Sequence, residues 1–315
     1  MNKYTRTIIL SLIFVAAVIL LENFLFRFLN NREEKRSNIS MILFDEGKKW
    51  DDVKAGATQA ADDGCDINYV VMPTGSSAKD QFDAINDELE RGADHVIVTA
   101  VDSYGLRDEL GDKYTYNVSF VGNGIDNDKY ITVEPDNYLM GINIGNLVIE
   151  EENPDSKVVI IDNGSNKEYI LDRINGVKEV LEESGITFEI WEFNPNETEM
   201  DSYTEKIDKY QPDVFIVLNE EAISTTIEMA DESDKPANIY AIANSDEAVY
   251  YLDNKKIKYL IYPDEFGMGY AAVKRVLDKN AYVNDDFKRL ITYKVVNRDD
   301  MYTSGYEKVL FPFVK

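Results

Sequence analysis

From Ile39 onward, short apolar runs rich in Val, Ile and Phe alternate with longer segments in which apolar residues recur every three or four positions. A short apolar run is typical of a buried strand, and the three-to-four spacing is typical of a helix with one apolar face. The pattern therefore predicts helices between successive strands, the first of them carrying Trp50, Val53 and Ala57. We expect strands at residues 39–44, 67–72, 95–100, 118–122, 158–162, 188–193, 214–219, 239–244 and 259–262.

Strands that alternate with helices indicate parallel sheets, so the predicted fold class is α/β. Nine strands exceed one ordinary open sheet, and we expect two Rossmann-like βαβ lobes with a seam near Pro135. No Gly/Ser-rich linker marks this seam, which favours two closely packed lobes. Ligands of such sheets bind beyond the carboxyl ends of the strands, so the loops after Phe44 and Asn219 are expected to hold the site.

An apolar segment near the N-terminus predicts a transmembrane helix. Residues 7–29 are mostly apolar, and a bilayer needs about 20 such residues. A cleaved signal peptide is the alternative, but Glu22, Asn23 and Arg27 stand where small residues would precede the cleavage site. We therefore expect residues 1–37 to form a short cytoplasmic stub, a retained anchor at about 7–29 and a charged spacer.

The composition narrows the function classes. The formal net charge is −26, which repels phosphate backbones and argues against nucleic-acid binding. A single cysteine, Cys65, excludes an internal disulfide framework, and a single histidine, His95, lies within a predicted strand. No nucleotide-binding or nucleophile-elbow motif is present, so we expect no catalytic residue, no metal ligand and no cofactor.

A series of short motifs follows the predicted anchor. They are Trp50-Asp-Asp-Val-Lys-Ala-Gly56-Ala57, Glu90-Arg-Gly-Ala-Asp-His-Val-Ile-Val, Asp136-Asn137 with Gly141, Arg173-Ile-Asn-Gly176-Val177, Pro212-Asp-Val-Phe-Ile-Val-Leu-Asn219-Glu220 and Pro263-Asp-Glu-Phe-Gly267. In content and order they resemble the ribose- and galactose-binding family of periplasmic proteins, which have the type I solute-binding fold. The resemblance covers about residues 38–315.

This resemblance implies a hinged clamp whose two lobes close around a small polar ligand. It implies three crossings between the lobes, which we place near Pro135, Tyr262 and Thr292. The N-terminal lobe then comprises residues 38–136 with 263–292, and the C-terminal lobe residues 137–262 with 293–315. The resemblance also orients the anchor, with the lobes outside the cytoplasm.

The resemblance implies ligand contacts at five positions. Sugar sites of this family stack the ring on aromatic side chains and bind its hydroxyls through Asp, Arg, Asn and Gln. Trp50, Arg173 and Asn219 fall on binding positions of the family. Lys49 replaces the first aromatic residue of the opening pair, and Asn123 stands in the Asp-Arg pair after the fourth strand.

Other positions depart from the family pattern. Gly122 and Ala243 replace two carboxylates that accept sugar hydroxyls, and Ile261 replaces a glutamine. Lys48 and Lys49 add positive charge at the lip of the expected cleft, which favours an anionic sugar derivative. An ordinary sugar, or a pocket that has lost its ligand, are the other interpretations.

The expected function is therefore a membrane-anchored, extracytoplasmic solute-binding protein that delivers a carbohydrate-like ligand to an ABC permease. The alternative is a binding protein that signals to a membrane sensor kinase, because a bare transmembrane helix is unusual for a transport receptor. A repressor with this fold would need an N-terminal helix-turn-helix, and the apolar segment occupies that place. In either case closure of the lobes is the change that a partner would detect.

Overall fold

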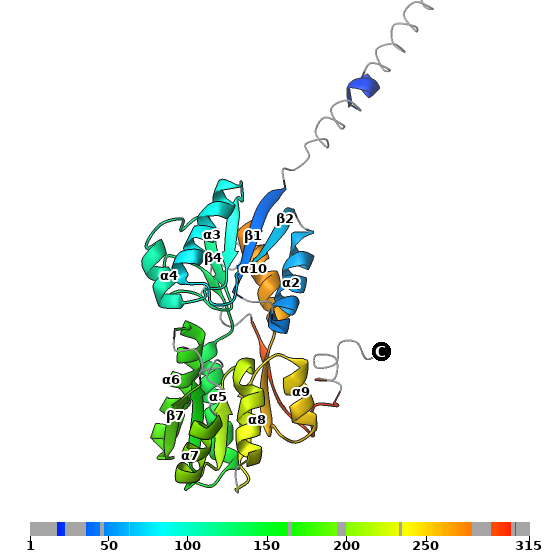
Figure 1. The fold of residues 1–315 in the computed structure, drawn as a ribbon. Coiled ribbons are helices and arrows are strands. Elements are labelled where there is room, and N and C mark those ends of the chain that lie inside the picture. The colour runs from blue at the N-terminus through cyan, green and yellow to red at the C-terminus, as the bar shows by residue number, and fades with distance from the viewer. Residues whose placement is uncertain are drawn as a thin grey trace, which may run out of the picture.

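The computed structural model describes residues 18–22, 36–44, 47–62, 64–162, 166–193, 200–232, 235–278, 291–303 and 306. Of the predicted membrane anchor, only residues 18–22 fall within these ranges, and they are helical. Among the described residues, no helix is both long and apolar enough to cross a membrane. From residue 36 onward the chain forms two lobes, which lie one above the other in Figure 1.

The first lobe is a parallel five-stranded sheet, in the order β2-β1-β3-β4-β5, with helices on both faces. Successive side chains of the first strand point to opposite faces of the sheet. Met41 and Leu43 pack toward α2 and α10, whereas Ile42 packs toward α3 and α4. The strands are β1 (Ser37–Leu43), β2 (Cys65–Val71), β3 (His95–Val98), β4 (Val118–Val121) and β5 (Thr132–Val133). The helices are α2 (Lys48–Ala61), α3 (Ala78–Glu90), α4 (Ser103–Leu110) and α10 (Glu265–Leu277).

The second lobe has a six-stranded sheet in the order β11-β10-β9-β8-β6-β7. Its core is divided in the same way, with Val159 and Ile161 packing toward α7, α8 and α9, and Val158 and Ile160 toward α5 and α6. The strands are β6 (Val158–Asp162), β7 (Phe188–Glu192), β8 (Val214–Val217), β9 (Asn238–Ile242), β10 (Tyr259–Pro263) and β11 (Tyr293–Asn297), and only β11 is antiparallel to its neighbour. The helices are α5 (Asn137–Glu151), α6 (Glu168–Ser184), α7 (Met200–Tyr210), α8 (Ile223–Glu232), α9 (Asp246–Asp253) and the 3₁₀ turn η1 (Glu220–Ala222).

The two lobes share one topology. Beginning from the first strand of each lobe, both sheets follow the order second, first, third, fourth, fifth, and β11 is added to the end of the second sheet. In a sheet of this order the connections leave in opposite directions from the first and third strands, which creates a crevice at their carboxyl ends. The crevices lie beside β1 and β3 in one lobe and beside β6 and β8 in the other.

The chain passes between the lobes at three places: from β5 to α5, from β10 to α10, and before β11. As a result α10, which is late in the sequence, packs against α2 of the first lobe (Figure 1). The predicted α/β class with parallel-sheet lobes is confirmed. The structure adds two strands to the nine expected, β5 and β11.

Candidate ligand-binding site

A small cavity lies between the lobes, at the carboxyl ends of the strands. Its volume is about 20 Å³, which is room for about one water molecule, whereas pockets for small ligands measure about 300–1,000 Å³. The first lobe and the hinge contribute Phe44, Trp50, Pro263 and Glu265; the second contributes Tyr169, Arg173, Asn219, Glu220, Glu221, Ile242, Ala243 and Asn244.

Trp50 forms the floor of the cavity on the side of the first lobe. Its side chain is 1% exposed and belongs to the core beneath α2, so it serves both packing and the cavity wall. The ring of Phe44 stands edge-on to it, with centroids 5.1 Å apart. Gly122 lies beside the indole, and its φ of +72° favours glycine there.

Arg173 enters the cavity from α6 in the second lobe. Its Nε donates to Asn137 Oδ1 at 3.0 Å, its Nη1 donates to the Leu218 carbonyl, and its guanidinium lies 4.9 Å from the Tyr169 ring centre. Burial lowers the pKa of this guanidinium from its ordinary value, and the nearby Glu265 opposes the shift. The arginine is therefore already held by protein groups of its own lobe.

Asn219 is the unusual member of the cavity wall. It follows β8, is 5% exposed, and neither its amide nitrogen nor its amide oxygen has a hydrogen-bond partner within the described part of the chain. Leaving a buried amide unsatisfied costs about 1–3 kcal/mol. A ligand hydroxyl, which both donates and accepts, would satisfy both atoms.

Acidic residues of the cavity wall escaped the sequence prediction. Glu220, Glu221 and Glu265 outnumber Arg173, the one cation among the lining residues described. Glu265 is 4% exposed and accepts a hydrogen bond from Asn244 at 3.1 Å. Glu221 pairs with Lys167 at 3.5 Å. The anionic-ligand interpretation depended on Lys48 and Lys49, whose side chains lie outside the described part of the structure, so it stays a prediction.

Two further predicted residues lie elsewhere. Asn123 does not line the cavity; its amide donates to the Ala100 carbonyl at 2.6 Å and accepts from Ser103 Oγ at 3.1 Å, which ties the β3–α4 loop to the end of β4. Lys49 is the second residue of α2, and its side chain lies outside the described part of the structure. The structure thus brings together three predicted residues: Trp50, Arg173 and Asn219.

Direct contacts hold the lobes together around the cavity. Ser103 of the first lobe donates its backbone N–H to the Asn166 carbonyl at 2.9 Å, and its hydroxyl accepts from the Glu168 N–H at 3.1 Å. On the hinge side, the Asn244 amide reaches Asp52 at 3.4 Å. The Lys167 ammonium lies 4.6 Å from the Phe44 ring centre. The conformation is therefore a closed one.

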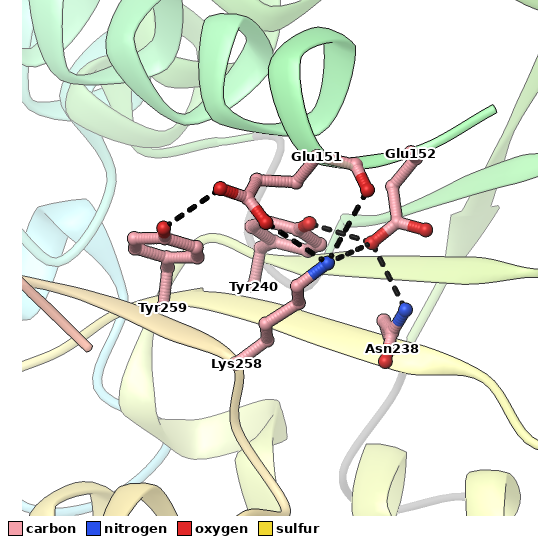
Figure 2. Close-up of polar contacts among 6 residues, drawn as sticks. All are labelled: Glu151, Glu152, Asn238, Tyr240, Lys258 and Tyr259. Atoms are coloured by element: carbon pink, nitrogen blue, oxygen red, sulfur yellow. Dashed lines mark hydrogen bonds and ion pairs between the residues drawn. The ribbon is translucent and has the colours of Figure 1, made fainter. Parts of the chain in front are cut away.

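A second polar cluster lies at the opposite end of the second lobe, where β9 and β10 begin. Figure 2 shows Glu152 at its centre, accepting from Tyr240 at 2.6 Å, Lys258 at 2.8 Å and Asn238 at 2.9 Å. Tyr259 donates to the neighbouring Glu151 at 3.0 Å. These polar groups satisfy one another, so the cluster fastens the end of α5 to the sheet. Within the described residues, no group of three His, Cys, Asp or Glu side chains is placed to hold a metal ion.

The cluster predicts instability at alkaline pH. Burial and the Glu152 carboxylate raise the pKa of Tyr240 above its ordinary 10.0; burial alone would lower the pKa of Lys258, but Glu152 and Glu151 raise it above 10.5. A pKa raised by folding stabilises the protein below the unfolded-state pKa, and this stabilisation is lost as the pH rises through the folded value. Urea unfolding is expected to show stability falling from about pH 10 upward.

Tyr240→Phe should flatten this alkaline decline, because the substitution removes one of the titrating groups. Tyr116→Phe is the matched control, since Tyr116 is 85% exposed. Equal alkaline slopes for the wild type and Tyr240→Phe would contradict the assignment.

The sheets, the hinge crossings and the interlobe cavity define a two-lobed α/β ligand-binding protein. A family model described as a periplasmic binding protein domain matches residues 39–279, and the chain belongs to this family. Among curated proteins, no sequence matches the chain.

Solved structures share the fold at low sequence identity. A glucose-galactose binding protein, GanP from Geobacillus stearothermophilus, is 17% identical with a TM-score of 0.71, over 85% of this chain and 99% of that one. An ABC transporter solute-binding protein from Agrobacterium vitis with bound D-fucose is 14% identical with a TM-score of 0.72, over 87% and 100%. The structure titled XylFII-LytSN complex is 19% identical with a TM-score of 0.70, over 84% and 99%.

Proposed function

We propose that this protein binds a small polar ligand of the carbohydrate class between its lobes. The buried Asn219 amide carries the proposal, because an unsatisfied donor and acceptor at the cavity wall stabilise nothing until a ligand meets them. Trp50 and Phe44 supply aromatic surface for the apolar face of a sugar ring. The similar structures of a glucose-galactose binding protein and of a solute-binding protein with bound D-fucose support the ligand class.

Binding requires the lobes to part, because a cavity of about 20 Å³ cannot admit a sugar. The contacts of Ser103 with Asn166 and Glu168, and of Asn244 with Asp52, would break on opening. Hinged domain closure is a common two-state change in such binding proteins. The apparent affinity then includes the cost of opening the closed form.

A melting-temperature screen tests the proposal. The full-length chain, kept in mild detergent, is heated alone and with neutral hexoses, pentoses, amino sugars and sugar acids. A ligand that binds only the folded state raises the melting temperature by an amount that grows with its concentration. At least one sugar should do so, and no shift with any member of the panel would overturn the proposal.

We propose that the N-terminal segment retains the protein at the cell membrane with both lobes outside the cytoplasm. The support is the apolar stretch at residues 7–29, together with the family to which the chain belongs. The full-length chain is then expected in the membrane fraction with its N-terminus intact, resisting salt and alkaline washes and released by detergent. Recovery of a trimmed, freely secreted form would contradict retention.

We propose an ABC permease as the recipient of the ligand, and a membrane sensor as the second candidate. The similarity to an ABC transporter solute-binding protein supports the first candidate, and the similarity to the structure titled XylFII-LytSN complex supports the second. A strain that lacks the protein distinguishes the permease from the sensor as the recipient. Uptake of the labelled ligand falls if the protein delivers it, whereas uptake persists and a transcriptional response disappears if the protein reports it.

A further inference from the structure

We propose that the first lobe docks on the membrane surface through the amino-terminal edge of its sheet, where Tyr114, Tyr116 and Ile131 contact lipid headgroups. This docking rests on the proposed membrane retention of the N-terminal segment and adds an orientation to it. It depends on where the chain enters the first lobe, on the apolar side chains exposed at that edge, and on the charges beside them.

The chain enters the first lobe at this edge. Because the five strands are parallel, the residues before β1, β3 and β4 lie at one end of the sheet, the end farther from the second lobe (Figure 1). Residues 30–36, seven in all, separate the apolar stretch at 7–29 from Ser37, the first residue of β1. A stretch of that length spans at most about 25 Å, so a retained anchor holds this edge close to the bilayer.

Three large apolar side chains are exposed at the same edge. Tyr116 is 85% exposed, Tyr114 39% and Ile131 37%. Tyr116 lies two residues before β4, and β4 is the second strand from β1 across the sheet, about 10 Å away at the usual strand spacing. Tyr116 and Ile131 line one surface hollow of about 260 Å³ together with Val118 and Val276. A tyrosine combines an apolar ring with a polar hydroxyl, and such side chains are enriched where lipid meets water.

The loop that carries the two tyrosines is held in a strained turn. Tyr114 has a φ of +62°, a left-handed conformation that is unfavourable for a bulky side chain. Its carbonyl accepts from the N–H groups of Asn117 at 2.8 Å and Val118 at 2.9 Å. The Asn117 side chain also donates to the Asp94 carbonyl at 3.0 Å, beside the start of β3. The backbone of the turn is therefore fixed, while the Tyr116 side chain stays exposed.

Two ion pairs lie at this edge. Lys129 pairs with Asp112, and Arg36, which precedes β1, pairs with Asp66 at 2.9 Å. The edge therefore presents cations as well as carboxylates, in contrast to the net charge of −26 of the whole chain. Exposed charges more than about 10 Å apart are largely screened at physiological ionic strength, so distant carboxylates do not prevent contact with a zwitterionic lipid surface.

Docking by this edge orients the ligand site. The carboxyl ends of the strands, where the interlobe cavity lies, then face away from the bilayer. The first lobe is fixed on the membrane, and the second lobe is the one that moves when the lobes part. A partner that detects this movement must extend above the membrane surface.

Nitroxide quenching of a tryptophan placed at the edge tests the inference. The full-length chain is inserted into phosphatidylcholine nanodiscs, with and without lipid that carries a nitroxide on its headgroup. The native Trp50 and Trp191 are 1% and 4% exposed, so they give a nearly constant background. Tyr116→Trp should lose about half of its added fluorescence to the labelled lipid, as an indole at headgroup level predicts. Tyr250→Trp is the matched control and should lose little, because Tyr250 is 63% exposed on α9 of the second lobe.

Two further substitutions distinguish contact from mere nearness. Tyr114→Asn removes a ring at a left-handed position that asparagine tolerates, and Ile131→Ser removes the neighbouring apolar side chain. Added together to Tyr116→Trp, they should reduce the quenching by about half, because binding to a lipid surface scales with the apolar area buried.

Equal quenching of Tyr116→Trp and Tyr250→Trp would overturn the inference, and is the result expected if a partner protein covers this edge instead of lipid. Quenching that Tyr114→Asn and Ile131→Ser leave unchanged would also overturn it, because tethering alone would explain such a result. A chain that stays in the nanodisc with Tyr116→Trp unquenched keeps its anchor and loses only the docking edge. A chain that does not enter the nanodisc contradicts the proposed retention, and this inference with it.

Discussion

Replacing Arg173 with alanine is expected to lower the free energy of unfolding of the second lobe by about 3–5 kcal/mol, because it removes two buried hydrogen bonds donated by a charged group, each worth about 1.5–3 kcal/mol. The residue is 6% exposed. Its removal leaves the Asn137 side chain and the Leu218 carbonyl without their donor and removes the cation from the Tyr169 ring. The same substitution should abolish any melting shift produced by a sugar.

Urea unfolding of the two variants Arg173→Ala and Arg107→Ala measures the effect against a surface control. Arg107 pairs with Asp108 at the surface, where an ion pair contributes about 1 kcal/mol or less. In the Arg173→Ala background, Glu265→Gln should recover part of the loss, because it removes a charge that the arginine had balanced. A loss below about 1 kcal/mol for Arg173→Ala would contradict a central role.

Gly176→Ala is expected to destabilise the second lobe by about 3 kcal/mol, although alanine favours a helix over glycine by about 1 kcal/mol. Helices α5 and α6 touch through their backbones at this point. A Cβ on Gly176 would come within 3.0 Å of the Tyr138 carbonyl oxygen and the Ile142 nitrogen. Main-chain atoms cannot turn aside as a side chain can, so the helices must separate.

Gly145→Ala on the facing helix is the matched control. Its Cβ would meet the Val180 side chain at 3.2 Å and the Val177 carbonyl oxygen at 3.5 Å, an ordinary contact, and we expect a change of about 1 kcal/mol or less. Gly269→Ala tests the equivalent contact in the first lobe, where α10 meets the Val53 carbonyl of α2. Comparable stability of Gly176→Ala and Gly145→Ala would show that the close backbone contact does not limit the packing.

The main strands were predictable because buried strands are short, nearly continuous runs of apolar residues in the sequence. Both faces of β6 and β8 are covered by helices, so Val158–Asp162 and Val214–Val217 are nearly continuous apolar runs. β5 has only two residues, too few for a period to show. β11 lies at the edge of its sheet, and its sequence Tyr-Lys-Val-Val-Asn has little contrast between faces.

Site residues that follow a strand or belong to a motif could be predicted from the sequence. Site residues that come together only where the two lobes meet could not. Asn219 follows directly from the end of β8, and Arg173 from its motif. The acidic wall was missed because Glu220 and Glu265 are two among 59 acidic residues, and only the hinge brings them together. Asn123 also ends a strand, yet its hydrogen bonds to Ala100 and Ser103 depend on a neighbouring loop that periodicity does not place.

Asn219→Leu is the substitution that tests the central claim most directly, read as melting temperature with and without the sugar that binds best. Leucine has nearly the shape of asparagine without its unsatisfied polar atoms. We predict that the ligand-free variant is more stable than the wild type by about 1–2 kcal/mol and no longer responds to the sugar. Asn123→Leu, which loses satisfied hydrogen bonds, should instead be destabilised by about 2 kcal/mol. An Asn219→Leu protein that melts lower than the wild type, or that still responds fully to the sugar, would contradict a ligand site at Asn219.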